Sequence, residues 1–398
     1  MRLTRRGWAL VAAGAVAVQL GLGLGSLDLV RIGLVALALV AAGATAVLTR
    51  SRRGRQRAWT VTRRVLPTRL HPGSSAQVQT LLTGRGLRGV QLAESAAPQL
   101  SGAGAPRARV RRAPGALTLD YQVHPTARGR WPLGPLMVTR TDPFAVARHR
   151  GPVGEPTDVL VWPALHPLTV TGDVVIGDPA RVALGVRSPA PDDSALREYH
   201  EGDDLRRVHW ASTARRGQVM VRADEHTDMR AVDVLVERPH GAAALEWTLS
   251  VGASIALAAL TAGHPVRLLG AGGPVEGYVH RRQGDQARAA LLDPTADASA
   301  SRSPAQAAER LLSASHELGA AGQVVVAVLG PAPESVRSAL AALPTRATCW
   351  VMVRADGPTS TAAQATVHQL RLAGWRGVVV HTGEDPDAAW RRLTEAAA

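Results

Sequence analysis

The densest set of reactive side chains in the sequence lies between Arg197 and Arg222. This stretch holds six arginines, four acidic residues, two histidines, a tyrosine and a tryptophan. Guanidinium groups bind carboxylates through two parallel hydrogen bonds and stack on indole rings. The composition therefore predicts either an ion-pair network that joins two domains or a docking surface. A third interpretation is a hydrolase-like enzyme that uses Asp203, His209 and Arg215, since such density can also indicate tuned pKa values.

The local pattern predicts how these side chains are positioned. Gly202 followed by Asp203 favours a turn and a helix start, because a carboxylate accepts the free N–H groups of the first helical turn. The helix is predicted to run to about Ala214, with Arg206, Trp210 and Ala214 on one face. Gly217 ends it, and residues 218–222 follow as a short strand.

The spacing R-x-Y-x-x-G-D-x-x-R-x-x-H-W resembles the signature of the domain of unknown function 58 family of bacterial membrane-associated proteins. Further landmarks in the same order are R-G-R-W-P-L-G-P at 128–135, D-P-F at 142–144 and V-W-P at 161–163. The positions that match the signature are Arg197, Tyr199, Gly202, Asp203, Arg206, His209, Trp210, Ala214 and Arg215.

This resemblance implies a C-terminal domain similar to von Willebrand factor type A. It also implies partners, because such proteins are commonly encoded beside MoxR-type AAA+ ATPases and transglutaminase-like membrane proteins. We therefore expect a membrane-anchored interaction or scaffold protein that works with the ATPase in envelope-related or protein-complex assembly. On this hypothesis Arg206, Trp210 and Arg215 hold the geometry that the partner recognises.

The sequence predicts no catalytic, metal or cofactor site. Metal-binding type A domains place Asp-x-Ser-x-Ser after the first strand, whereas the corresponding residues 237–241 read E-R-P-H-G. The serines are missing, and Arg238 would repel a cation, so we expect no Mg²⁺ there. The G-A-G-G run at 270–273 lacks the Lys and Ser/Thr of a phosphate loop.

Composition narrows the class of protein further. All 46 basic residues are arginine, and the formal net charge is +14. No basic stripe alternates with stacking aromatics, so we do not expect nucleic-acid binding, and attraction to anionic lipid accounts for part of the charge. The single cysteine, Cys349, excludes a disulfide within the chain and is predicted to be buried in a strand.

Residues 1–57 are predicted to form a transmembrane hairpin with basic flanks. Two apolar runs, 8–24 and 29–48, are separated by a short turn, which argues against a signal peptide. Arginines precede and follow the hairpin, while the turn carries only Asp28. The positive-inside rule then predicts a two-pass protein of the inner (plasma) membrane whose termini and soluble domains are cytoplasmic.

The remaining chain is predicted to be an α+β multidomain protein. Short alternating segments broken by Pro and Gly predict a β-sandwich-like domain over 58–190. Within it, Phe144, the only phenylalanine, is expected to fill the core beneath a loop. Residues 191–229 form the signature joint, and strands alternating with helices over 230–398 predict a mostly parallel α/β domain.

Overall fold

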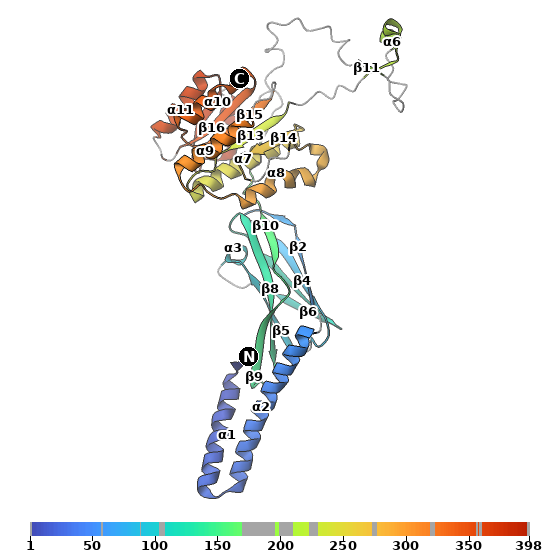
Figure 1. Ribbon diagram of the computed structural model, residues 1–398, viewed down its shortest axis with the longest axis vertical. Helices are drawn as coiled ribbons and strands as arrows, with labels where there is room; N and C mark the ends of the chain where they lie inside the picture. The colour runs from blue at the N-terminus through green and yellow to red at the C-terminus, as the bar shows by residue number, and fades with distance from the viewer. Residues whose placement is uncertain are drawn as a thin grey trace. The chain divides into compact units, whose positions relative to one another are not determined.

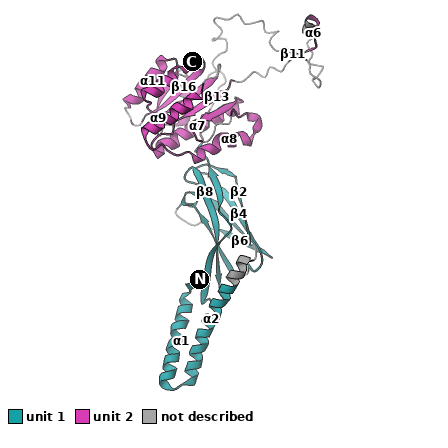
Figure 2. Cartoon of the chain, in the orientation of Figure 1, with its two compact units in different colours: residues 1–164 teal, residues 165–398 magenta. Residues whose placement is uncertain are grey.

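The computed structural model describes residues 2–56, 59–87, 89–102, 108–168, 196–198, 210–222, 230–272, 277–318, 323–355, 357 and 360–395. The chain divides into two compact units, residues 1–164 and 165–398 (Figure 2).

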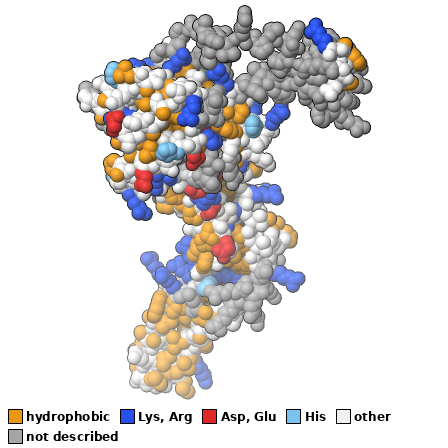
Figure 3. All heavy atoms as spheres, turned by 45° about the horizontal axis from the view of Figure 1, so that its top comes forward, with side chains coloured by type: hydrophobic (Ala, Val, Ile, Leu, Met, Phe, Trp, Pro, Cys, Tyr) orange, Lys and Arg blue, Asp and Glu red, His pale blue; other side chains and the backbone are white. Residues whose placement is uncertain are grey.

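The first unit begins with two long apolar helices, α1 (Arg5–Leu24) and α2 (Leu27–Gln56) (Figure 1). Gly25 ends α1 in the left-handed conformation. A Cβ on Gly14 would lie 3.0 Å from the carbonyl oxygen of Gly33, so the two helices pack closely where both have glycine. Hydrophobic side chains cover the visible face of this hairpin (Figure 3). Both helices are long and apolar enough to cross a membrane, as the sequence predicts.

The rest of the first unit consists of two sheets that share one hydrophobic core. The first sheet has the order β1-β9-β8-β10-β3, with β5 also paired to β8, and the second has the order β2-β4-β7-β6. The core draws on both sheets, with Leu82 and Tyr121 from one and Leu136 and Val159 from the other. The bounds are β1 Arg2–Leu3, β2 Thr60–Leu66, β3 Arg69–Leu70, β4 Ala76–Thr83, β5 Val90–Ala96, α3 Pro98–Ser101, β6 Arg109–Ala113, β7 Ala116–Val123, β8 Gly129–Thr141, β9 Ala147–Val153 and β10 Thr157–Val161.

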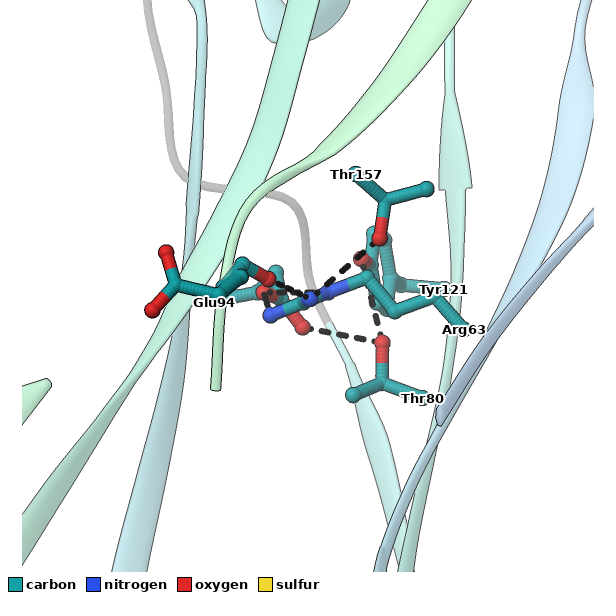
Figure 4. Close-up of polar contacts among 6 residues, drawn as sticks. Arg63, Thr80, Glu94, Tyr121 and Thr157 are labelled. Carbon is teal, nitrogen blue, oxygen red and sulfur yellow. Dashed lines mark hydrogen bonds and ion pairs between the residues drawn. The ribbon is translucent and has the colours of Figure 1, made fainter. Parts of the chain in front are cut away.

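A buried ion pair connects the two sheets (Figure 4). Arg63 on β2 donates to Glu94 on β5, and both side chains are only 2% exposed. The second oxygen of Glu94 accepts a hydrogen bond from Thr80 on β4, and Arg63 also donates to the carbonyl oxygen of Glu155. Each charge is therefore compensated and hydrogen-bonded, as burial of charge requires.

The second unit contains a parallel five-stranded sheet of order β14-β13-β15-β16-β17. Alternate residues of each strand face opposite sides. Val234 and Val236 approach α7 at Gly252, whereas Leu235 packs in a core with residues of α9, α10 and α11. The bounds are β11 Leu196–Glu198, α6 Trp210–Arg216, β12 Met220–Arg222, β13 Val232–Val236, α7 Ala242–Ala262, β14 Val266–Leu269, η2 Arg281–Gln283, α8 Asp285–Asp297, α9 Pro304–His316, β15 Val324–Leu329, α10 Glu334–Ala341, η3 Leu343–Thr345, β16 Thr348–Ala355, α11 Thr361–Leu372, β17 Arg376–His381 and α12 Pro386–Glu395.

Helix α7 is also long and apolar enough to span a membrane, but 67% of its most apolar window is buried inside the domain. Its apolar surface is explained by the sheet that it covers, whereas only 17% and 22% of the corresponding windows of α1 and α2 are buried. The two N-terminal helices therefore remain the candidates for a membrane anchor among the described helices.

One sequence-based expectation about the first unit is wrong. Phe144 does not fill the core, because its side chain is 56% exposed in the loop between β8 and β9. The neighbouring Val146 is buried instead. The apolar residue that anchors the loop is thus Val146, and Phe144 points away from the protein interior.

Candidate functional site

The place where an open parallel sheet binds ligands follows from its topology. Strand β14 follows β13 on one side, and β15 returns to the other side of β13, so the strand order reverses between β13 and β15. Ligands of such sheets bind outside the carboxyl ends of the strands at this reversal. The first residues after β13 and β15 are Glu237 and Gly330. This carboxyl edge is the candidate site.

An internal ion pair occupies part of the edge. The Glu237 carboxylate accepts the N–H of Gly330 at 2.5 Å and lies 3.7 Å from the guanidinium of Arg354, a β16 residue. The side chains of Glu237 and Arg354 are 13% and 3% exposed. A Cβ on Gly330 would lie 2.8 Å from Arg354 Nη2 and 3.0 Å from Glu237 Oε2. Only glycine fits here without displacing the pair.

Helix α7 completes this arrangement. Arg354 Nη1 donates to Thr248 Oγ1 at 3.0 Å, and the Thr248 hydroxyl donates to the carbonyl oxygen of Ala244 at 2.9 Å. The buried guanidinium thus has an acidic and a neutral acceptor. We infer that Glu237 and Arg354 hold the edge together and leave Glu237 little freedom to act as a base or a ligand.

Two further arginines at the same edge, Arg238 and Arg310, have no acidic partner among the described residues. In this they differ from Arg354, which is paired with Glu237. Arg238 follows Glu237, and its Nε is buried without a hydrogen-bond acceptor there. Burial lowers the pKa of Arg238, and the positive charge of Arg310 on α9 lowers it further. Like charges held together without a carboxylate repel each other, so an anion placed between them would be stabilised.

Ser301 links these two arginines. Its hydroxyl donates to the carbonyl oxygen of Arg238 at 2.6 Å and accepts from Arg310 Nη1 at 3.3 Å. The carbonyl oxygen of Ser301 also lies 2.9 Å from Nδ1 of His240, whose side chain is exposed. Arg238 of the loop 237–241, for which the sequence predicts no Mg²⁺, therefore lies near a second positive charge, that of Arg310. In the described part of the chain, no three His, Cys, Asp or Glu side chains gather as a metal-binding group.

At the amino ends of β13 and β14 two opposite charges are paired. Asp233 on β13 accepts two hydrogen bonds from Arg267 on β14, at 2.9 and 3.0 Å. Tyr278 lies under the Arg267 guanidinium and accepts a hydrogen bond from Gln323 at 2.6 Å. Burial, followed by the charge of Asp233, raises the pKa of Tyr278 to about 12. The charges of Asp233 and Arg267 are therefore paired with each other, in contrast to those of Arg238 and Arg310.

The signature joint is described only in part. Tyr199, Gly202, Asp203, Arg206 and His209 lie outside the described residues, and of Arg197 only the backbone is described. Trp210, Ala214 and Arg215 lie on α6 with exposed side chains, Trp210 at 69%. Gly217 ends α6 with a positive φ, as the sequence predicts, and β11 pairs antiparallel with β12. The polar cluster of Asp203, His209 and Arg215 therefore stays a prediction.

Comparison with known families bears on the same stretch. A family model described as "Protein of unknown function DUF58" matches residues 195–353. The match supports the DUF58 family. It runs from the signature joint through most of β16, so it includes Glu237, Arg238, Arg310 and Gly330. No curated protein matches the chain. The description of the matching family assigns no function.

Sequence reasoning missed most of the carboxyl edge. Arg238 was recognised only as an obstacle to a cation, and Arg310, Ser301 and Arg354 were not identified. One signal was present: Arg354 interrupts the apolar run of residues 348–355. A charged residue inside such a strand must have a buried partner. The sequence alone does not identify Glu237 as the partner of Arg354.

Proposed function

We propose that this chain is a membrane-anchored, non-enzymatic interaction protein whose C-terminal α/β domain binds an acidic segment of a protein partner at the carboxyl edge of its sheet. The observation that carries the proposal is the pair Arg238 and Arg310, which has no acidic partner in the described residues. Guanidinium groups are suited to carboxylates because their planar geometry permits two hydrogen bonds.

A domain similar to von Willebrand factor type A is part of this proposal. The parallel strand order supports it, together with an antiparallel bridge between Val266 of β14 and Val279 that adds a short segment at the sheet edge. In this proposal Arg354 supplies, from within the domain, the positive charge that faces Glu237 at the end of the first strand. The acidic segment of the partner would then be bound by arginine side chains and not through a metal cation held by the domain.

The proposed partner is a MoxR-type AAA+ ATPase, with a transglutaminase-like membrane protein in the same assembly. Two helices long and apolar enough to cross a membrane support the anchor. Arginines precede and follow the hairpin, whereas its turn carries only Asp28 and a single arginine, Arg31, lies in the first part of α2. This distribution supports a cytoplasmic position for the soluble units. That position would give the C-terminal domain access to a cytoplasmic ATPase.

The experiment is a binding measurement between the purified full chain in nanodiscs and the proposed partner, a MoxR-type AAA+ ATPase. We expect Arg238→Ala with Arg310→Ala to weaken binding by about tenfold or more, and added salt to weaken the unchanged protein more than the double variant. Arg346→Ala, which removes an exposed arginine at the amino end of β16, is the matched control. Unchanged affinity in the double variant, with an unchanged melting temperature, would refute the proposed binding edge.

A further inference from the structure

The loop between β8 and β9 has a defined shape. Asp142 is buried, and its two carboxylate oxygens accept the N–H groups of Phe144 at 2.8 Å and Ala147 at 2.5 Å. Ala145 has a φ of 59°, a left-handed conformation that disfavours a residue with a Cβ by about 1–2 kcal/mol. These hydrogen bonds hold the loop in that conformation and leave Phe144 exposed.

The same loop is fixed to both helices of the hairpin. The N–H of Thr4 donates to the carbonyl oxygen of Val146 at 2.9 Å, and the Thr4 hydroxyl donates to that of Ala145 at 2.6 Å. A Cβ on Gly7 of α1 would come within 2.2 Å of the Val146 oxygen, and one on Gly43 of α2 within 2.6 Å of Val146 Cγ2. Glycine at both positions allows Val146 to lie against the two helices at one level.

That level can be placed along the hairpin from the helical rise. Gly7 lies 17 residues before the end of α1 at Leu24, and Gly43 lies 16 residues after the start of α2 at Leu27. At 1.5 Å per residue these distances are about 26 and 24 Å, close to the ~30 Å thickness of the hydrocarbon core of a bilayer. If the hairpin spans the membrane as proposed, the loop lies where the acyl chains meet the headgroups.

The side chains exposed around this level suit such a boundary. Trp8 follows Gly7 and is exposed, as is Phe144. Aromatic residues are enriched at the headgroup level, and basic residues near it attract anionic lipids. The exposed arginines near the hairpin end of the first unit are Arg2, Arg5, Arg6, Arg148 and Arg150.

We propose that residues 142–146 form a membrane-contact loop, in which Phe144 inserts into the boundary between acyl chains and headgroups of an anionic bilayer. Val146 and Asp142 fix the loop against the hairpin, and the nearby arginines contact the lipid headgroups. The inference rests on the membrane anchor of the proposed function but not on the carboxyl edge. Its consequence is that the β-rich part of the first unit meets the lipid surface directly.

Depth measurement on the full chain in vesicles of phosphatidylethanolamine and phosphatidylglycerol tests this inference. Cys349 is buried, so a fluorophore can be attached selectively to Val35→Cys, Phe144→Cys, Arg148→Cys or Glu155→Cys. Val35 is exposed within α2, and Glu155 lies beyond the opposite end of β9 from Phe144. Arg148→Cys keeps Phe144 in place. Quenching by lipids that carry a nitroxide at the headgroup or deep in the acyl chain then reports the depth of each label.

We expect the Val35 label to be quenched by the deep nitroxide and the labels at 144 and 148 by the shallow one, at least about twofold more than the label at 155. If the label at 144 is as accessible to water as that at 155 while the label at 35 is embedded, the membrane-contact loop is refuted and the anchor stands. If the label at 35 is also in water, the anchor itself fails, and the inference fails with it.

Discussion

The guanidinium of Arg63 and the carboxylate of Glu94 lie 2.9 Å apart between the two sheets of the first unit, with almost no exposure to solvent. Each residue comes from a different sheet, and Thr80 and Thr157 contribute hydroxyl groups around them (Figure 4). Because both charges are buried away from water, removing either one leaves the other without a counter-charge and destabilises the fold.

Glu94→Ala leaves Arg63 buried without its counter-charge, so we expect a loss of about 3–5 kcal/mol in the stability of the first unit. Arg63→Met with Glu94→Leu removes both charges and should recover most of that loss. Hydrogen exchange of β2 and β5 in the detergent-solubilised chain measures the effect. The pair Arg111 and Asp120 is the control, because the Arg111 side chain is 68% exposed and Arg111→Ala should change stability by less than about 1 kcal/mol.

Gly330→Ala tests the packing of the carboxyl edge. The added methyl group would overlap Arg354 and Glu237, and overpacking of this kind destabilises by about 1–3 kcal/mol. Thermal melting followed by circular dichroism should show a lower melting temperature. Gly241→Ala is the matched control, because its Cβ would meet only Ala244 at 3.7 Å. Equal melting temperatures for the two variants would contradict the close approach described at Gly330.

Cys349 should be unreactive in the folded protein. Burial raises the pKa of its thiol from 9.0 to about 12, so the thiolate is scarce at pH 8. As pH rises, the thiol ionises in the unfolded chain before it does so in the folded protein. The contribution of the protonated thiol to folding stability is therefore complete below pH 9 and is lost as pH rises towards 12. Alkylation with iodoacetamide should be slow in buffer and fast in denaturant. Rapid modification of native protein would contradict burial of the thiol.

Trp210 should contribute little to stability, because its indole is exposed on α6. We expect Trp210→Ala to change the free energy of unfolding by no more than about 0.5 kcal/mol. If the signature joint docks a partner, the same variant should still weaken capture of the ATPase. A large loss of stability would instead favour the ion-pair network that the composition of this segment also predicts.

The orientation of the hairpin can be measured in cells. A fluorescent protein fused after residue 398 should fluoresce, and alkaline phosphatase at the same position should be inactive, because arginines flank the hairpin on the predicted cytoplasmic side. A fusion with the opposite pair of activities would place the soluble units outside and would remove the proposed access to the ATPase.

Local signals predicted much of the second unit. The predicted alternation of strands and helices over 230–398 agrees with the observed elements, and Gly263 ends α7 in the left-handed conformation, which glycine adopts without strain. Helix α8 was missed although its buried residues Ala287, Leu291 and Thr295 recur at helical spacing, because Pro294 inside the segment argues against a helix. Packing against the rest of the domain stabilises the helical conformation of this segment.

The candidate site was harder to predict because its contacts join distant residues. Glu237 and Arg354 are separated by more than a hundred positions, and only the strand order brings them together. Phe144 was assigned to the core because hydrophobicity alone does not distinguish a buried position from an exposed one in a loop. The signature residues predicted most specifically lie largely outside the described part of the chain.

The pairing of β1 with β9 also bears on the order of biosynthesis. Arg2 and Leu3 align with Arg148 and Ala147, so their partners are translated almost 150 residues later. A hairpin that spans a bilayer would reach the insertion machinery well before that strand leaves the ribosome. Docking of the two should then be a late folding event at the membrane surface, and a protein fused ahead of Arg2 would obstruct it.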